Sequence, residues 1–441
     1  MPVAVDAERD IHAKALALNL DTSVYGTFAE IGAGQEVARW FLSVGAASGT
    51  VATTVSAYDK IVSDDLYGVS TRYVSKERLE AMLDREYQLL LERLGATRGE
   101  NTCFFVFADT IATRNYQGTN EQHGWAGLRF QCEPGSEPSQ IVLHINLRDP
   151  TAQLQQAAIG ILGVNLIYAI FRQRASIDTF LSGLFDELST TRIEIDVLRL
   201  DGPAFSNEDS AEWCMALLGH KMAHGIVLDP PSGVVEPSCV LRKRPLVVLR
   251  GTFHHPELLD PALLQCATRQ LLAEGTQFER EPAVVVEMTI RPVSHATTLS
   301  STEIVRCIRD LNPRYPVIAS DFAETYLLSR YLRRYSTEPV RFVMSIATAA
   351  KVMHETFYQD LPGTLLEGLG RLLAANVKLY VAPMPHAAFQ AALSDVSGTV
   401  AVKPSGKSVI GLDDLVPAAP ARYLLEYLRA TGRIVALDGG A

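Results

Sequence analysis

The stretch PLVVLRG, residues 245–251, followed by PALLQCATRQLLAEG, residues 261–275, predicts a buried strand that leads into a helix. The same alternation of a short apolar strand and a helix of 10–15 residues continues along the chain. The later pairs are AVVVEMTI (283–290) with SSTEIVRCIRDL (300–311), YPVIASD (315–321) with AETYLLSRYLRRY (323–335), and VRFVMSI (340–346) with helical sequence to Asn376, before VKLYVAP (377–383).

This rhythm decides the expected fold class, which is α/β. Such units build a parallel sheet with right-handed crossovers, so we predict an open, doubly wound, Rossmann-like sheet over residues 244–385. Five units are too few for an eight-fold barrel unless the first half contributes strands. Residues 421–438 offer one more helix and a short strand, and we expect the segment 386–441 to dock on the α/β domain.

The first half predicts an α+β domain over residues 1–243. Residues 35–46 and 75–96 have helical spacing, and Ser75 is placed to cap the second helix. The apolar run 157–171 is shorter than the roughly 20 residues of a membrane span, so we expect a buried helix. Strands are predicted at 103–109, 127–132, 141–147 and 192–200. Residues 229–243, rich in Pro, Gly and Ser, are the best candidate linker.

Charge and cysteine content limit the classes of partner and compartment. The 441 residues carry a formal net charge of −10, which disfavours general binding to nucleic acid or to an anionic membrane. The six cysteines are scattered and form no CxxC, as in a reduced cytosolic protein. The first residues lack the pattern of a signal peptide. We therefore expect a cytoplasmic protein with a small-molecule ligand, and its apolar faces make a homodimer a candidate assembly.

In a parallel sheet the carboxyl ends of the strands share one edge, where ligands bind. As contacts to a ligand or its phosphate we select Arg250, Gly251, Thr252 and Glu287, and for general acid–base work His254, His255 and Asp321. The alternative is an edge that is polar because it reaches solvent. No cofactor is assigned; a nucleotide, with Mg²⁺ beside it, is the candidate.

Two glycine turns in the first half are further candidates for an anion site. They are Gly32, Gly34 and Gln35 before one helix, and Ser48, Gly49 and Thr50 after it. Close packing at tight turns is the alternative. Asp109 at a strand end and Asn165 in the buried helix are added as ligand contacts, with an asparagine bonded to neighbouring backbone as the alternative for the latter.

Several histidines remain without a role at this stage. His123 and Trp125 are expected in a loop. His220 and His224 have the i, i+4 spacing of zinc ligands but no intervening glutamate, and we assign no metal ligands.

The segment RGTFHHPELLD, residues 250–260, resembles the first motif of the HIGH-superfamily nucleotidyltransferases, such as nicotinate-nucleotide adenylyltransferase. Gly251, Thr252 and Phe253 match, whereas Glu257 and Asp260 stand where the superfamily has its two phosphate-binding histidines. LSSTEIVRCI, residues 299–308, is similar to the second phosphate motif but follows the second strand instead of lying near the domain's end. The resemblance implies a nucleotide-binding sheet.

A second resemblance covers nearly the whole chain. It rests on ALNLDTSVYGTFAEIGAGQEVARWFLSVGAASGT, RYVSKERLEAML, FFVFADT, HGWAGLRFQ, GILGVNLIYAIF, KRPLVVLRGTF and KLYVAPM, in this order. These segments resemble a widespread family of bacterial cytosolic proteins without an assigned function, whose automatic labels, adenylyltransferase-like and TonB-dependent receptor, disagree. The family implies no reaction.

Two hypotheses of function follow. One is an enzyme that binds a nucleotide or another phosphorylated molecule at the strand-end edge of the C-terminal sheet, with nucleotidyl transfer as its candidate reaction. The other is a non-catalytic nucleotide-binding or assembly protein that has lost the HxGH chemistry.

Overall fold

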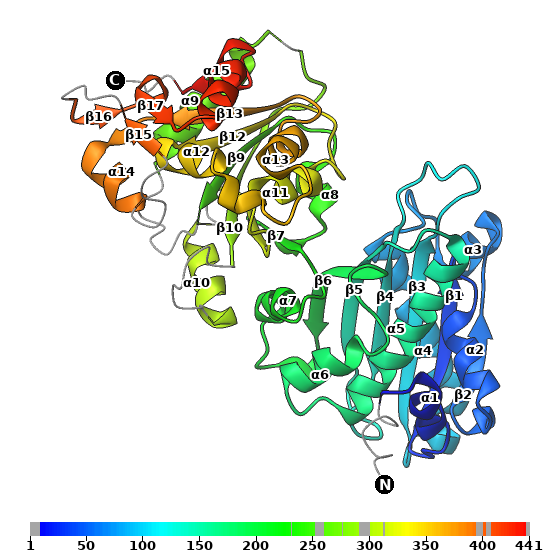
Figure 1. Cartoon of the computed structure of the whole chain (residues 1–441). Coiled ribbons are helices and arrows are strands. Elements are labelled where there is room, and N and C mark those ends of the chain that lie inside the picture. The colour runs from blue at the N-terminus through cyan, green and yellow to red at the C-terminus, as the bar shows by residue number, and fades with distance from the viewer. Residues whose placement is uncertain are drawn as a thin grey trace. The chain divides into compact units, whose positions relative to one another are not determined.

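The computed structural model describes residues 9–230, 232–251, 260–275, 277–290, 300–311, 314–393, 400–402 and 407–437. The chain folds into two compact units, which we call unit 1 (Met1–Ile226) and unit 2 (Val227–Ala441). Each unit is built on its own sheet (Figure 1). The division falls earlier than the boundary at residue 243 that the sequence suggested.

Unit 1 is a mixed sheet covered by helices on both faces. Its elements are α1 (Ile11–Asn19), β1 (Val24–Ile31), α2 (Glu36–Ser43), η1 (Ala47–Gly49), β2 (Val51–Val55), α3 (Lys60–Tyr67), α4 (Lys76–Arg98), β3 (Cys103–Ala112), β4 (His123–Phe130), β5 (Ser139–Leu147), α5 (Ala152–Arg172), α6 (Ile177–Leu184), β6 (Ile193–Asp201), η2 (Pro203–Phe205) and α7 (Ser210–Gly219). The strand order is β2-β1-β3-β4-β5-β6. β2, β1 and β3 run parallel, and β3 to β6 alternate in direction.

The two faces of this sheet are covered by different helices. Phe105 of β3 contacts Phe171 of α5, and α2 packs on α5, so these helices share one face. Gly127 of β4 lies against Leu83 of α4 on the other face, because neighbouring residues of a strand point to opposite faces. The glycine allows α4 to approach the sheet closely.

Helix α5 is the buried helix that the sequence predicted. It is long and apolar enough to cross a membrane, but 72% of its most apolar 18-residue window is buried inside the structure. Ser75 caps α4 by accepting a hydrogen bond from the Arg78 backbone N–H, also as predicted.

Unit 2 is a doubly wound sheet. Its elements are β7 (Gly225–Asp229), which crosses the boundary, β8 (Gly233–Val235), α8 (Pro237–Leu241), β9 (Leu246–Gly251), α9 (Pro261–Ala273), β10 (Ala283–Thr289), α10 (Ser301–Leu311), β11 (Val317–Ser320), α11 (Thr325–Leu332), β12 (Val340–Ser345), α12 (Ile346–Val352), η4 (Glu355–Tyr358), α13 (Thr364–Leu372), β13 (Val377–Ala382), β14 (Met384–Pro385), α14 (His386–Ala392), β15 (Val400–Val402), β16 (Val409–Ile410), η6 (Leu412–Asp414), β17 (Leu415–Pro417), α15 (Ala421–Ala430) and β18 (Ile434–Ala436).

The eight strands of unit 2 lie in the order β18-β13-β12-β9-β10-β11-β7-β8. The pairs from β18 to β11 are parallel, so the predicted α/β class and open parallel sheet are confirmed. Alternate residues of β9 enter different cores: Val247 packs with Leu264 and Leu271 of α9, and Val248 packs with Leu328 of α11. β18 docks beside β13 at one edge, as the tail of the sequence suggested.

Residues 24–31 and 51–55, for which no strand was predicted, form the parallel strands β1 and β2. Two local predictions were wrong. The proposed linker 229–243 contains β8 and α8, and β8 extends the second sheet. His123 and Trp125 lie in strand β4 and not in a loop, and Trp125 is buried.

Candidate functional site

The strand order of unit 2 defines where a ligand would bind. From β11 through β10, β9, β12 and β13 to β18, the order in the chain is 3-2-1-4-5-6, which is the order of dinucleotide-binding sheets. The order reverses between β9 and β12. Ligands of open α/β sheets bind outside the carboxyl ends of the strands at such a reversal. The candidate edge of unit 2 therefore begins at Arg250 and Gly251, the last residues of β9.

Arg250 is held by neighbouring strand ends. Its Nε lies 3.3 Å from Oε2 of Glu287, which is its register partner on β10. Its Nη1 donates to Thr325 Oγ1 at 3.1 Å, and its Nη2 donates to the carbonyl oxygens of Phe322 and Ala323. The guanidinium thus ties β9 to β10 and to the segment after β11.

Glu287 is the buried partner at the base of this network. Ser320 Oγ donates to its carboxyl group, and no exposed surface remains on the residue. Burial raises the pKa of Glu287, although the charge of Arg250 and the hydrogen bond from Ser320 oppose the rise. The arrangement stabilises the strand ends beneath the edge.

The structure brings part of the predicted set together. Arg250, Gly251 and Glu287 lie at the ends of adjacent strands, and the nearly buried Asp321 follows β11. Thr252, His254 and His255 lie outside the described residues.

Unit 1 has a reversal of its own. Its chain passes from β1 through α2 to β2 on one side, then through α3 and α4 to β3 on the other side of β1. Glu30 of β1 and Asp109 of β3 are register partners near the carboxyl ends of these parallel strands. Both carboxyl groups are buried.

The two carboxyl groups are held by backbone donors. Glu30 accepts hydrogen bonds from the N–H groups of Val37 and Ala38 at 3.0 and 2.9 Å, at the start of α2. Asp109 Oδ1 accepts from Ile31 N–H at 3.2 Å, while Asp109 Oδ2 has no hydrogen-bond partner among the described residues. The anion position at the start of α2 is therefore filled by the protein's own Glu30.

Burial raises the pKa of Glu30 to about 7, opposed by the hydrogen bonds from Ala38 and Val37. Burial also raises the pKa of Asp109 well above its usual range, and the nearby Glu30 carboxylate adds to the shift. Because two adjacent buried carboxylates repel each other, the pair retains a proton near neutral pH.

The first glycine turn lies beside this pair. Gly32 has φ +95°, and a Cβ there would lie 1.9 Å from the Ile111 carbonyl oxygen, so close packing requires the glycine. Gly34 has φ +81°, a Cβ there would make only an ordinary contact with Glu36 Cγ at 3.9 Å, and its N–H donates to Tyr58 Oη at 2.9 Å. Gln35 is the exposed N-cap residue of α2.

The second glycine turn lies at the opposite end of the strands from the first. Ser48, Gly49 and Thr50 precede β2, at the amino end of a strand parallel to β1. A Cβ on Gly49 would meet the Asn19 carbonyl oxygen at 2.6 Å, and Thr50 Oγ1 donates to Leu18 O. The two glycine turns do not converge, and the second packs against the end of α1.

Asn165 is likewise engaged within the protein. Its side chain accepts from Lys14 Nζ at 2.7 Å and donates to the carbonyl oxygens of Leu184 and Asp186. Burial lowers the pKa of Lys14, although Asp186 opposes the shift. The structure therefore shows the asparagine bonded to neighbouring groups of the protein, as in the alternative to a ligand contact.

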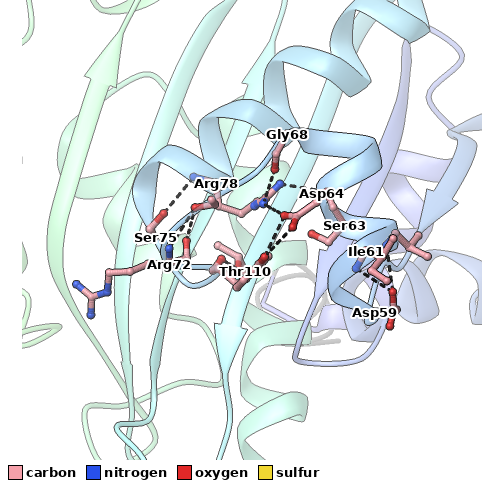
Figure 2. Close-up of polar contacts among 12 residues, drawn as sticks. Asp59, Ile61, Ser63, Asp64, Gly68, Arg72, Ser75, Arg78 and Thr110 are labelled. Carbon is pink, nitrogen blue, oxygen red and sulfur yellow. Dashed lines mark hydrogen bonds and ion pairs between the residues drawn. The ribbon is translucent and has the colours of Figure 1, made fainter.

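Residues 59–78, which we call the strap, comprise α3, its connection to α4 and the first residues of α4. The buried Arg78 holds the strap together, near the carboxyl end of β3 (Figure 2). Arg78 donates to the carbonyl oxygens of Ser63 and Gly68, at 3.2 and 2.7 Å, and pairs with Asp64 at 3.1 Å. Thr110, next to Asp109, donates its hydroxyl to the Tyr73 carbonyl oxygen at 2.6 Å. The strap of residues 59–78 is therefore fixed to the same strand end.

Sequence reasoning missed a polar cluster on β4, β5 and β6, which we call the His144 cluster. It consists of His123, Trp125, His144, Asn146 and Asp196. Its signal was weak but present: polar residues occupy alternate positions of apolar strands, which marks a polar set on one face of a buried sheet.

Comparisons with known proteins find partial similarity to solved structures. No family model matches the chain. No curated protein matches it either. The competence/damage inducible protein CihA from Agrobacterium tumefaciens is 19% identical, with 36% of this chain and 94% of that chain covered and a TM-score of 0.27. The competence-damaged protein (CinA) superfamily protein from Enterobacter cloacae is 10% identical, with 37% and 92% covered and a TM-score of 0.27. No activity is carried over from these proteins.

Proposed function

We propose that the protein binds a nucleotide or another phosphorylated small molecule at the carboxyl edge of the unit 2 sheet. The observation that carries this proposal is the 3-2-1-4-5-6 strand order, with its reversal between β9 and β12. In sheets of this order, the turn after the first strand approaches the phosphates of the ligand. Here that turn begins at Gly251.

The Arg250 network supports a positioning role for this arginine. Its donors contact Glu287, Thr325 and two backbone carbonyl oxygens. In the proposal, Arg250 fixes the base of the edge at which the phosphate binds. Mg²⁺ would accompany a triphosphate through its oxygens.

The reaction that we propose to test first is nucleotidyl transfer, on the resemblance of residues 250–260 alone. The competing function is nucleotide binding without catalysis. It is favoured by Glu257 and Asp260, which stand in place of the superfamily's two histidines. We propose a cytoplasmic location and a homodimer as the assembly to be tested with it, as well as membership in the bacterial family that the sequence resembles.

A binding screen tests the proposal. Nucleoside mono-, di- and triphosphates and sugar phosphates are added to the full chain, and thermal unfolding is followed; a ligand that binds the folded state raises the transition temperature. Gly251→Val should remove the shift, because a side chain blocks backbone approach at the turn. Lys378→Ala, at the amino end of β13 and so at the opposite end of the strands, is the matched control and should leave it unchanged.

Two results would overturn the proposal: no ligand produces a shift, or Gly251→Val leaves every shift intact. His255→Ala tests the catalytic assignment from sequence. If the nucleotide binds and pyrophosphate release from a triphosphate is absent, the non-catalytic alternative is supported.

A further inference from the structure

The His144 cluster of unit 1 joins three adjacent antiparallel strands. His144 of β5 lies opposite Trp125 of β4, and His123 of β4 lies opposite Asn146 of β5. On β6 the register shifts at this level: Ile145 pairs with Ile195 and His144 with Val197, which leaves Asp196 as an extra residue. A bulge of this kind redirects a side chain and is common beside functional sites.

The bulge directs Asp196 toward His144. His144 Nδ1 lies 2.5 Å from Asp196 Oδ1, and Asn146 Nδ2 donates to Asp196 Oδ2 at 2.6 Å. An ionised carboxylate only accepts hydrogen bonds, so the proton of neutral His144 is on Nδ1 and its Nε2 carries a lone pair. His144 and Asp196 are both buried, so this orientation is held by the fold.

The lone pair of His144 faces a second imidazole. His144 Nε2 lies 3.0 Å from Nδ1 of His123. Two nitrogens bound to one tetrahedral Zn²⁺ at 2.0–2.1 Å are separated by about 3.3 Å. The observed pair is close to that separation, and a shift of a few tenths of an ångström would admit the metal.

We propose that His123 and His144 bind a divalent transition metal of the Zn²⁺ class, with Asp196 and Asn146 as the outer layer that orients His144. Metal-binding histidines donate their other ring N–H to a carboxylate or carbonyl, and the His144–Asp196 contact reproduces that arrangement. On binding, His144 Nε2 and His123 Nδ1 donate lone pairs, and the proton on His123 Nδ1 moves to His123 Nε2, so that His123 binds as a neutral imidazole.

This inference concerns unit 1 and is independent of the nucleotide proposed for unit 2. It is tested with Co²⁺, whose visible absorption reports tetrahedral coordination by nitrogen ligands. Trp125 supplies a second signal, because its ring lies 4.8 Å from the His144 ring, and a bound paramagnetic ion quenches its fluorescence.

The full chain is titrated with CoCl2 and, in competition, with ZnCl2. We expect a saturable 1:1 absorption change that Zn²⁺ displaces. His144→Gln and His123→Gln should each abolish it, and Asp196→Asn should weaken binding by about 10–100-fold while the band shape is retained. His220→Gln is the matched control, since His220 also pairs with a carboxylate, Asp178, and should change nothing.

The readouts separate loss of the site from loss of the fold. Trp125→Phe should lessen the fluorescence change and keep the absorption band, and circular dichroism of each variant shows whether unit 1 is folded. If the His144→Gln protein does not fold, His123→Gln still tests the site, because His123 is only half-buried and its replacement should disturb the fold less. No saturable Co²⁺ binding by the wild type, or binding equal in a folded His123→Gln or His144→Gln protein, would overturn the proposal and leave a structural hydrogen-bond network.

Discussion

At the scale of single residues, unit 1 contains buried ionisable groups that change its free energy of unfolding. Glu30 and Asp109 lie side by side with raised pKa values, whereas Arg78 is buried among acceptors that fix the strap of residues 59–78. All three tryptophans, Trp40, Trp125 and Trp213, lie in unit 1, so tryptophan fluorescence reports the unfolding of this unit.

The first prediction concerns pH. Because the pKa of Glu30 rises from 4.5 to about 7 on folding, the native state binds more protons than the unfolded state between these values. The free energy of unfolding of unit 1 should therefore fall as pH rises from about 4.5 to about 7.

Asp109→Asn should reduce this fall. The amide oxygen can still accept from Ile31 N–H, and the buried charge is removed. At pH 8 we expect the free energy of unfolding to increase by about 1–3 kcal/mol, with a smaller gain at pH 5. Urea unfolding followed by tryptophan fluorescence measures both. Asp65→Asn, on an exposed residue of α3, is the control; an equal effect of the two variants would contradict the assignment.

The second prediction concerns Arg78. Arg78→Met keeps the aliphatic volume and removes the donor of two carbonyl oxygens and the cation beside Asp64, which keeps its hydrogen bonds from the Tyr73 hydroxyl. We expect a loss of about 3–5 kcal/mol in the free energy of unfolding, as for other broken buried ion pairs. Arg85→Met, on the exposed side of α4, should cost well under half of that, and similar losses would show that the strap contributes little.

At the scale of elements, the turns and strands of unit 1 show why pattern and packing must be considered together. The predicted α4 has its N-cap at Ser75, because that preference is set by local hydrogen bonding. Strand β1 was missed, because VYGTFAEI is interrupted by Gly26 and by polar residues. Those residues are buried since helices cover both faces of the sheet, which a local pattern does not reveal.

The third prediction compares the two glycines of the first turn. Gly32→Ala introduces a left-handed alanine and a Cβ 1.9 Å from the Ile111 carbonyl oxygen, so we expect a loss of about 3 kcal/mol or more. Gly34→Ala has a similar φ but its Cβ would make only an ordinary contact, 3.9 Å from Glu36 Cγ, so it should lose only about 1–2 kcal/mol. Chemical unfolding measures the difference, and equal losses would show that backbone conformation alone decides.

At the scale of the whole molecule, the edge strand β18 completes the unit 2 sheet from the far end of the chain. Ile434 is buried in the core that Val248 and Leu328 share. Ile434→Ala should lower the stability of unit 2 by about 2–5 kcal/mol, and Ile434→Val by about 0.5–1.5 kcal/mol. Far-UV circular dichroism reports both units, whereas tryptophan fluorescence reports unit 1. Because Ile434 lies in unit 2, we expect Ile434→Ala to shift the unfolding transition seen by circular dichroism more than the transition seen by tryptophan fluorescence. Identical shifts in both signals would show that the two units unfold as one cooperative unit.

The sequence by itself determined the α/β class, the alternating strands and helices of the second half, the buried helix α5 and the docking strand at the tail. Each depends on the local pattern of apolar residues. This pattern can be recognised within a single segment, without knowledge of what the segment packs against.

Only the tertiary structure decided which polar residues meet. It placed Glu30 beside Asp109 and His144 between His123 and Asp196, and it separated the two glycine turns to opposite ends of the strands of one sheet. It also showed that Arg250 and Asn165 bind partners within the protein: Arg250 forms an ion pair with Glu287, and Asn165 accepts a hydrogen bond from Lys14. These contacts join strands far apart in sequence, and their partners depend on strand order and register, which local spacing does not encode.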